Sequence, residues 1–224
     1  MADEIAVTFI FPVFNEERRI KNLPAIIKYF RENIKFAFEI LVVCNGCTDS
    51  TYNLGLILSK QFSELRILQT PIRGRGNALK LGFQNSFGNI IAVCAIDRAW
   101  HEHFYVNALQ LMGSGKYDVI LGPKSHPESI VQRPIIRLVM SFFVKYYIGL
   151  LFGHKVGDVN CVKVFNKKKC AFFADLGDYN YFSETEFFLR ARDAELRFHM
   201  IPVIVSDNNI FSKVKFRSLV QFFI

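Results

Sequence analysis

The sequence predicts an α/β domain with a mostly parallel central sheet flanked by helices. Short apolar runs rich in β-branched and aromatic residues alternate with longer segments whose apolar residues recur at helical spacing. This alternation favours a parallel sheet. Polar clusters stand where three of the predicted strands end, and ligands of such sheets bind beyond the carboxyl ends of the strands. The two observations predict one ligand-binding domain over residues 1–224.

The first half of the chain has the most regular alternation. Strands are predicted at 5–14, 38–44, 65–69, 90–96 and 117–121. Helices are predicted over 20–34, 54–62, 77–87 and 103–112, where apolar residues share one helical face. Asn15 is expected to cap the first helix, and the run Thr48 to Ser50 offers caps for the second.

The second half is less regular. A polar loop with two prolines is predicted over 122–134, and a very apolar helix over 135–152. A turn and strand at 158–165, a helix at 184–194 and a strand containing Pro202 at 196–205 complete the prediction.

Composition limits the class of protein and its partners. Hydrophobic residues make up 51% of 224 residues, which excludes a disordered chain, and 24 Phe against 1 Trp predict a core rich in Phe. The formal net charge of +8 favours anionic partners such as nucleotide phosphates or acidic lipid headgroups. Nucleic acid is the least favoured, because the basic residues are dispersed and no nucleic-acid reading motif is present.

Cysteine usage and hydropathy predict a cytoplasmic protein. The five cysteines are scattered and mostly lie in apolar runs, which favours reduced thiols. Cys44 and Cys47 have C-x-x-C spacing but no second pair, so a loop is favoured over zinc or redox chemistry. The acidic start is unlike a secretory signal. No apolar run of about 18 uncharged residues is present, and the nearest, 134–152, is interrupted by Arg137 and Lys145.

Two polar clusters follow predicted strands. Asn15 and Glu16 follow the first strand, where they can hydrogen-bond a base or ribose, or only cap a helix. The second cluster runs from Asn45 to Asp49. Gly46 permits tight backbone geometry there, and Asp49 is both a helix-cap candidate and a possible ligand contact.

The third cluster, Arg73-Gly74-Arg75-Gly76-Asn77, opens a predicted helix. It brings two guanidinium groups to a helix N-terminus, which suits a diphosphate. The alternative is a solvated basic turn. The dinucleotide fingerprint G-x-G-x-x-G is absent from this segment.

Pro12 to Glu16, Asn45 to Thr51 and Gly74 to Leu79 resemble the first three motifs of the inverting glycosyltransferase family that includes dolichyl-phosphate mannose and glucose synthases. That family has the GT-A fold, a Rossmann-like nucleotide-diphospho-sugar transferase fold. The resemblance implies a nucleotide-sugar-binding half at 1–112 and an acceptor half at 113–224. The implied ligands of the nucleoside-diphosphate sugar are Pro12, Asn15, Glu16, Asn45, Gly46, Asp49, Arg73, Arg75, Gly76 and Asn77.

The family's motifs also imply a divalent metal. Its usual Asp-Asp-Gly-Ser-Thr-Asp begins here with Cys44 and Asn45, and its Asp-x-Asp places Ala95 on the first acid and Asp97 on the second. One carboxylate can suffice for Mg²⁺ or Mn²⁺, because phosphates and water supply the remaining oxygens. The resemblance therefore implies Asp97 as metal ligand and catalytic residue. The alternative is a metal-independent or inactive protein. His101 and His103 lie just downstream and could assist, but exposed positions at a helix start are the favoured interpretation for both.

Later segments resemble the acceptor side of the family more loosely and favour its polyprenyl-phosphate branch. A lipid phosphate is already anionic and can attack directly, and Lys124, Arg133 and Arg137 are the candidates that would bind it. A sugar hydroxyl would need a general base, for which Glu186 and Asp158 are the candidates. Each carboxylate also has a plain interpretation as an ion-pair partner.

The prediction is thus a transferase that makes peripheral contact with the inner face of a membrane. The helix at 135–152 suits the interface as well as it suits a core position, and the tail at 211–217, in which basic and apolar residues alternate, suits a surface anchor. Two rivals stay open: transfer to a glycan or small-molecule hydroxyl, and a non-catalytic nucleotide-binding protein, which Ala95 suggests.

Overall fold

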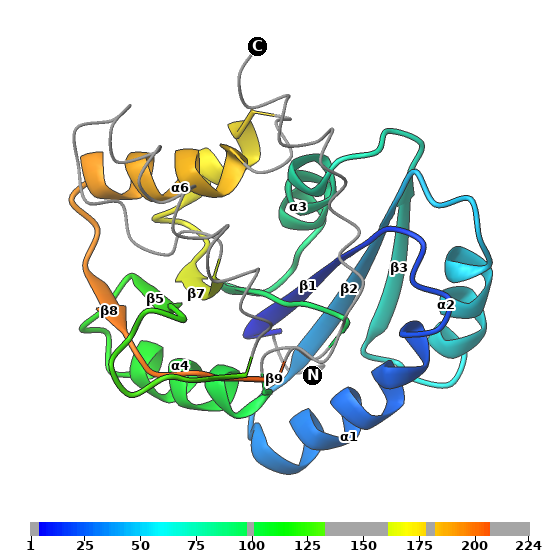
Figure 1. Cartoon of the computed structure of the whole chain (residues 1–224), viewed down its shortest axis with the longest axis horizontal. Helices are drawn as coiled ribbons and strands as arrows, with labels where there is room; N and C mark the ends of the chain where they lie inside the picture. Colours follow the sequence, from blue (N-terminus) through cyan, green and yellow to red (C-terminus); the bar gives the residue numbers. More distant parts are fainter. Residues whose placement is uncertain (1–4, 98–100, 133–160, 178–181, 207–224) are drawn as a thin grey trace.

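The computed structural model describes residues 5–97, 101–132, 161–177 and 182–206. A seven-stranded sheet has the order β3-β2-β1-β4-β7-β5-β8, and β6 and β9 form a separate pair (Figure 1). The strands are β1 (Val7–Val13), β2 (Phe38–Asn45), β3 (Leu65–Thr70), β4 (Ile90–Val93), β5 (Val119–Gly122), β6 (Ile130–Gln132), β7 (Val162–Asn166), β8 (Phe198–Met200) and β9 (Ile204–Ser206). The helices are α1 (Leu23–Asn33), α2 (Thr51–Ser59), α3 (Arg75–Gln84), α4 (His103–Gly113) and α6 (Phe182–Asp193), with 3-10 turns η1 (Ile20–Asn22) and η2 (Ala171–Asp175).

The sheet is mostly parallel, as predicted. β7 is antiparallel to both of its neighbours, β4 and β5, whereas the other neighbouring strands run parallel. All eight residues of β2 are buried, because helices cover both faces of a parallel sheet and its central strands become continuous apolar runs. The carboxyl ends of β1, β2 and β3 therefore lie side by side at one edge of the sheet.

Helices cover the sheet on both faces (Figure 1). One apolar cluster lies under α1 and α4 and contains Phe9 stacked on Phe30, with ring centroids 4.1 Å apart. The other lies under α3, η2 and α6 and contains Phe165 against Phe173 at 5.0 Å. The core is rich in Phe, as the composition predicts.

The first helix does not begin after Asn15. η1 starts at Ile20 and α1 at Leu23, with Asn22 at the N-cap and Pro24 in the first turn. Asn15 instead has a φ of 51°, in the left-handed region that Asn tolerates better than most residues. Its side chain bonds a different loop, so the prediction that it caps this helix is wrong.

Three boundaries in the rest of the chain also differ from the prediction. The strand expected at 196–205 is two strands, β8 and β9, which belong to different sheets. Pro202 lies between them, where it has no N–H to donate to a strand partner. β6 forms inside the loop predicted at 122–134, because Ile130 to Gln132 pair with β9. β4 ends at Val93 rather than at Ile96, where its register with β7 also ends at Lys163.

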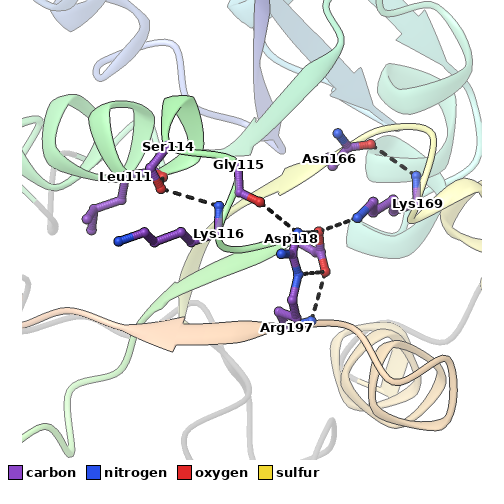
Figure 2. A network of polar contacts seen from close by, with 8 residues as sticks. All are labelled: Leu111, Ser114, Gly115, Lys116, Asp118, Asn166, Lys169 and Arg197. Carbon is purple, nitrogen blue, oxygen red and sulfur yellow. Dashed lines mark hydrogen bonds and ion pairs between the residues drawn. The ribbon is translucent and has the colours of Figure 1, made fainter.

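A charged network lies at the end of the sheet opposite the carboxyl ends of β1 and β4. Asp118 precedes β5, and its carboxylate accepts hydrogen bonds from Arg197 Nε at 2.9 Å and Lys169 Nζ at 2.7 Å (Figure 2). The Arg197 backbone N–H also donates to it at 3.0 Å. Bonding to Arg197 is the largest of the influences that lower the pKa of Asp118 well below its usual value. The network ties the start of β8 to β5 and to the chain after β7.

Membrane contact was predicted for two segments, at 135–152 and 211–217. Both lie outside the described residues. Among the residues that are described, no helix has the length and hydropathy needed to span a membrane.

Candidate functional site

Asn45 connects the three polar clusters at the carboxyl edge of the sheet. It is the last residue of β2 and is 4% exposed. Its Nδ2 donates to the Val13 carbonyl at 2.7 Å, and its Oδ1 accepts from the Gly74 backbone N–H at 3.1 Å. One side-chain amide therefore joins the end of β1 to the loop that enters α3. By bonding the backbone of both segments, it holds them next to each other.

The first and second clusters bond to each other directly. The Thr48 backbone N–H donates to Asn15 Oδ1 at 2.8 Å, and Asn15 Nδ2 donates to Thr48 Oγ1 at 3.1 Å. The Glu16 backbone N–H donates to Thr51 Oγ1 at 2.7 Å. Asp49 Oδ1 accepts from the Thr51 backbone N–H at 3.0 Å, at the start of α2, and its Oδ2 accepts from the Glu17 N–H at 3.3 Å. Ser50 rather than Asp49 stands at the N-cap of α2, and Asp49 bonds the first backbone N–H of the helix from the residue before that cap.

Gly46 and Arg73 bring the second and third clusters together. The Gly46 backbone has a φ of 61°, and its N–H donates to the Thr70 carbonyl at 2.8 Å. A Cβ at position 46 would lie 3.0 Å from the Arg73 Cβ, so this close approach needs glycine. The Arg73 guanidinium carbon lies 4.2 Å from the centre of the Phe14 ring, a cation–π contact at the exit of β1.

The third cluster forms the N-terminal end of α3. Gly74 is the N-cap, and Arg75, Gly76 and Asn77 make the first turn. The first N–H groups of a helix have no partner within the helix, and the helix dipole favours an anion beside them. Arg75 Nε donates to Glu184 Oε1 at 2.7 Å, which brings α6 against this helix end.

Glu184 and Lys163 are the residues of this site that the sequence prediction missed. Glu184 is 4% exposed and Lys163 2%, and the Lys163 ammonium bonds the Glu184 carboxylate on the side opposite Arg75. Burial raises the pKa of Glu184, but the charges of Lys163 and Arg75 outweigh it and lower the pKa to about 2. The carboxylate is therefore an anion at neutral pH.

The sequence places both residues within apolar patterns, where a charged side chain is unusual. Phe187 and Ala191 follow Glu184 at helical spacing and are buried, so Glu184 shares the apolar face of α6. Lys163 interrupts the apolar strand from Cys161 to Phe165. A charged residue on a buried face needs a partner of opposite charge, and these two are partners.

Asp97 follows β4, the strand that pairs with β1 on the side away from β2. It is partly exposed, and the loop that carries it is held by Asn22, whose Nδ2 donates to the Ile96 carbonyl at 3.1 Å. Within the described ranges, no three His, Cys, Asp or Glu side chains gather as a possible metal site. A single carboxylate with Ala95 two residues earlier suits a divalent ion only if phosphate and water oxygens supply the other ligands.

Residues 8–170 match the family model described as Glycosyl transferase family 2. The chain belongs to this family. Glycosyltransferase AglD of Haloferax volcanii is 28% identical over 206 residues, which cover 89% of this chain and 33% of that protein. The dolichyl-phosphate beta-glucosyltransferase ALG5D of Trichomonas vaginalis is 28% identical over 181 residues, covering 75% of this chain and 55% of that protein.

The chain thus spans between a third and about half the length of these two relatives. A solved structure of glucosyl-3-phosphoglycerate synthase from Mycobacterium tuberculosis, in complex with Mn²⁺, UDP and glucosyl-3-phosphoglycerate, superposes with a TM-score of 0.65. Its sequence identity is 16%, over 93% of this chain and 73% of that one. The likeness confirms the GT-A fold expected from the sequence.

The other predicted site residues are less closely connected to the three clusters. Lys124 follows β5 and is partly exposed. Glu186 Oε2 accepts from the Gly177 backbone N–H at 2.8 Å, and Glu186 Oε1 lies 2.6 Å from Arg190 NH2, so the plain ion-pair interpretation of Glu186 is confirmed. Arg133, Arg137 and Asp158 lie outside the described residues.

The exposed positions predicted for two histidines are confirmed. His101 and His103 are exposed at the start of α4, where His101 contacts Ser206 and His103 contacts Asn107. All five cysteines are free thiols. Burial, the largest of several causes, raises the pKa of Cys44 to about 12, so the Cys44 thiol stays protonated.

Proposed function

We propose that this chain transfers a sugar from a nucleoside-diphosphate sugar to a polyprenyl phosphate of the dolichyl type, with inversion at the anomeric carbon. The observation that supports it is the joining of Asn15, Asn45 and the start of α3 at one edge of the sheet, in a member of glycosyl transferase family 2. The relative named as a dolichyl-phosphate beta-glucosyltransferase supports the choice of acceptor.

The donor is proposed to lie across the carboxyl ends of β1, β2 and β3. Its base and ribose would contact the loops of Asn15, Glu16 and Asp49, and its diphosphate would lie near Arg75 and the first turn of α3. The helix end favours the negative charge, and a guanidinium pairs well with phosphate oxygens. Arg73 is proposed to assist from its position over Phe14.

The reaction proposed is a direct displacement. An oxygen of the lipid phosphate forms a bond to the anomeric carbon from the face opposite the diphosphate. The bond from that carbon to the diphosphate oxygen breaks, and its electron pair leaves with the nucleoside diphosphate. The protein positions the two anions and stabilises the departing diphosphate. Lys124 is proposed to contact the lipid phosphate, and the same role is proposed for Arg133 and Arg137.

Two described carboxylates on α6, those of Glu184 and Glu186, favour an acceptor that needs no general base. A base works best when its pKa is close to the working pH, whereas the pKa of Glu184 is lowered to about 2 by Lys163 and Arg75 against the effect of burial. Glu186 is held by Arg190 and the Gly177 N–H. A phosphate acceptor is already ionised and attacks without losing a proton.

A divalent ion, Mg²⁺ or Mn²⁺, is proposed to bind Asp97 together with oxygens of the diphosphate. The ion would supply positive charge to the leaving group. The related structure that contains Mn²⁺ and UDP supports this proposal. Ala95→Asp should then increase the affinity for the ion, because the substitution adds a second carboxylate ligand.

The first experiment is transfer of labelled sugar from a panel of nucleotide sugars into a lipid extract containing dolichyl phosphate, with and without Mn²⁺. Labelled lipid that is lost in Asp97→Ala and retained in Asp193→Ala would support the proposal, because Asp193 is an exposed carboxylate at the end of α6. Labelled glycan in place of labelled lipid would overturn the acceptor. Nucleotide binding without any product would favour a non-catalytic protein.

Contact with the inner face of a membrane belongs to the same proposal. The acceptor is a lipid, and the net charge of +8 suits anionic headgroups. Flotation of the full chain with vesicles that contain anionic lipid measures this contact. Recovery of the protein only in the unbound fraction would contradict it.

A further inference from the structure

We infer that Ser183 and the first turn of α3 form a subsite for the terminal phosphate of the nucleoside diphosphate, with the Ser183 hydroxyl donating to a phosphate oxygen. The inference rests on the proposed function and adds a binding residue from the acceptor half of the chain. Three observations support it: the Ser183 hydroxyl has no partner within the described part of the chain, Ser183 lies against Gly76, and charged residues surround these two positions.

The Ser183 hydroxyl is buried without a partner. Ser183 is 1% exposed, and among the described residues its Oγ finds no hydrogen-bond partner. Leaving a buried hydroxyl unpaired destabilises the folded state, and buried polar groups in native proteins are rarely unpaired. A bound ligand that accepts a hydrogen bond would account for a hydroxyl at this position.

Ser183 lies directly against the N-terminal end of α3. A Cβ built on Gly76 would lie 3.2 Å from Ser183 Oγ and 3.2 Å from the Gly177 carbonyl. Gly76 is in the first turn of a helix of 10 residues, where backbone N–H groups lack partners within the helix. A hydroxyl donor and a helix N-terminus therefore meet at one point, and both suit a phosphate.

Charged residues frame the same point. Arg75 precedes Gly76 and Glu184 follows Ser183, and the two side chains are joined at 2.7 Å. Glu184 would repel a phosphate, but its carboxylate is also bonded to Lys163, so it lies between two cations. The Arg75 side chain is 36% exposed, so solvent reaches this arginine beside the first turn of α3.

The position favours the terminal phosphate over the inner one. Gly76 belongs to the nucleotide-sugar-binding half, whereas Ser183 lies on α6 in the acceptor half. The terminal phosphate carries the sugar and is the group from which the sugar departs. It must therefore lie where the two halves meet, while the inner phosphate stays closer to the nucleoside.

The test is the affinity of Ser183→Ala for nucleoside diphosphates and monophosphates, measured by calorimetry with UDP, UMP, GDP and GMP. We expect diphosphate affinity to fall about 10-fold, as the loss of about 1.4 kcal/mol implies, with monophosphate affinity unchanged. Because the hydroxyl has no protein partner, the unfolding midpoint should stay the same or rise. Gly76→Ala, which adds a methyl group against Ser183, should also lower the affinity for the diphosphate.

Ser86→Ala is the matched control. Ser86 is another buried serine, 5% exposed, at the opposite end of α3, and its Oγ donates to the Phe83 carbonyl at 2.6 Å. This variant should lose stability and keep the wild-type ratio of diphosphate to monophosphate affinity. A Ser183→Ala protein with the wild-type ratio would overturn the inference, whether or not its stability changes.

Two further outcomes separate this inference from the proposed function. A Ser183→Ala protein whose only change is a higher KM for the polyprenyl phosphate would move the hydroxyl to the acceptor and overturn the inference alone. A wild-type protein that binds neither diphosphate and transfers no sugar would overturn both.

Discussion

Arg75 Nε and Glu184 Oε1 lie 2.7 Å apart although 109 residues separate them in the chain. Arg75 opens α3 in the first half of the protein, and Glu184 lies on α6 in the second. Lys163 on β7 bonds the same carboxylate. A cluster of three charges, of which Glu184 and Lys163 are buried and Arg75 is partly exposed, thus joins the two halves at the edge of the sheet where the substrates are proposed to bind.

Replacing Glu184 by glutamine should destabilise the fold. Lys163 is 2% exposed, and removing the partner of a buried charge typically costs about 3–5 kcal/mol. Urea unfolding of Glu184→Gln measures the loss. Glu64→Gln is the control, because Glu64 pairs with Arg31 at the surface and surface pairs contribute about 0–1 kcal/mol. Equal losses in the two variants would contradict the prediction.

The stability of the protein should fall in acid partly because of Glu184. Its pKa is lowered from 4.5 to about 2, since Lys163 and Arg75 outweigh burial. The contribution is therefore complete above pH 4.5 and is lost as the pH falls toward 2, when the folded state must bind the proton that the unfolded state already holds. The free energy of unfolding of Glu184→Gln should depend less steeply on pH in this window than that of the wild type. Identical slopes would exclude the assigned pairing.

Asn45→Ala should disturb both stability and nucleotide binding. The substitution leaves the Val13 carbonyl and the Gly74 N–H without their side-chain partner, and each buried unpaired group costs about 1–3 kcal/mol. Calorimetry with UDP and GDP should show weaker binding, because the loop that enters α3 is no longer held. Asn33→Ala removes only an exposed bond to the Tyr29 carbonyl and should change neither quantity. Full nucleotide affinity in Asn45→Ala would argue against this role.

Gly46→Ala should be more harmful than Gly115→Ala, although both glycines have a positive φ. The values are 61° and 68°, so the backbone strain of a side chain is similar. A Cβ at position 46 would meet Arg73 Cβ at 3.0 Å, whereas nothing lies within 4 Å at position 115. We expect Gly115→Ala to cost about 1 kcal/mol, and Gly46→Ala to cost more and to weaken nucleotide binding. Thermal unfolding and calorimetry measure both, and equal effects would rule out the steric argument.

Local periodicity and strand-end clusters were sufficient to predict the first half of the fold. β1, β2 and β3 are apolar runs whose carboxyl ends carry the polar residues. Because the strands are parallel, these ends lie on the same side of the sheet, and the polar residues gather there. The same reasoning predicted that Asn15 caps the first helix and that a single strand runs from 196 to 205 through Pro202. Both errors arose where a distant partner determines the backbone: Thr48 for Asn15, and β5 and β6 for the two strands.

The amino-acid sequence by itself determined the α/β class, the mostly parallel character of the sheet and the three clusters at the strand ends, because these depend on residue type and spacing over short stretches. Only the tertiary structure decided that Asn45 bonds two loops, that Ser183 lies against Gly76, and that Glu184 lies between Arg75 and Lys163. These contacts join residues far apart in the chain. A buried charge or amide is tolerated only where the fold supplies a partner for it, and spacing along the sequence does not reveal which distant residue that partner is.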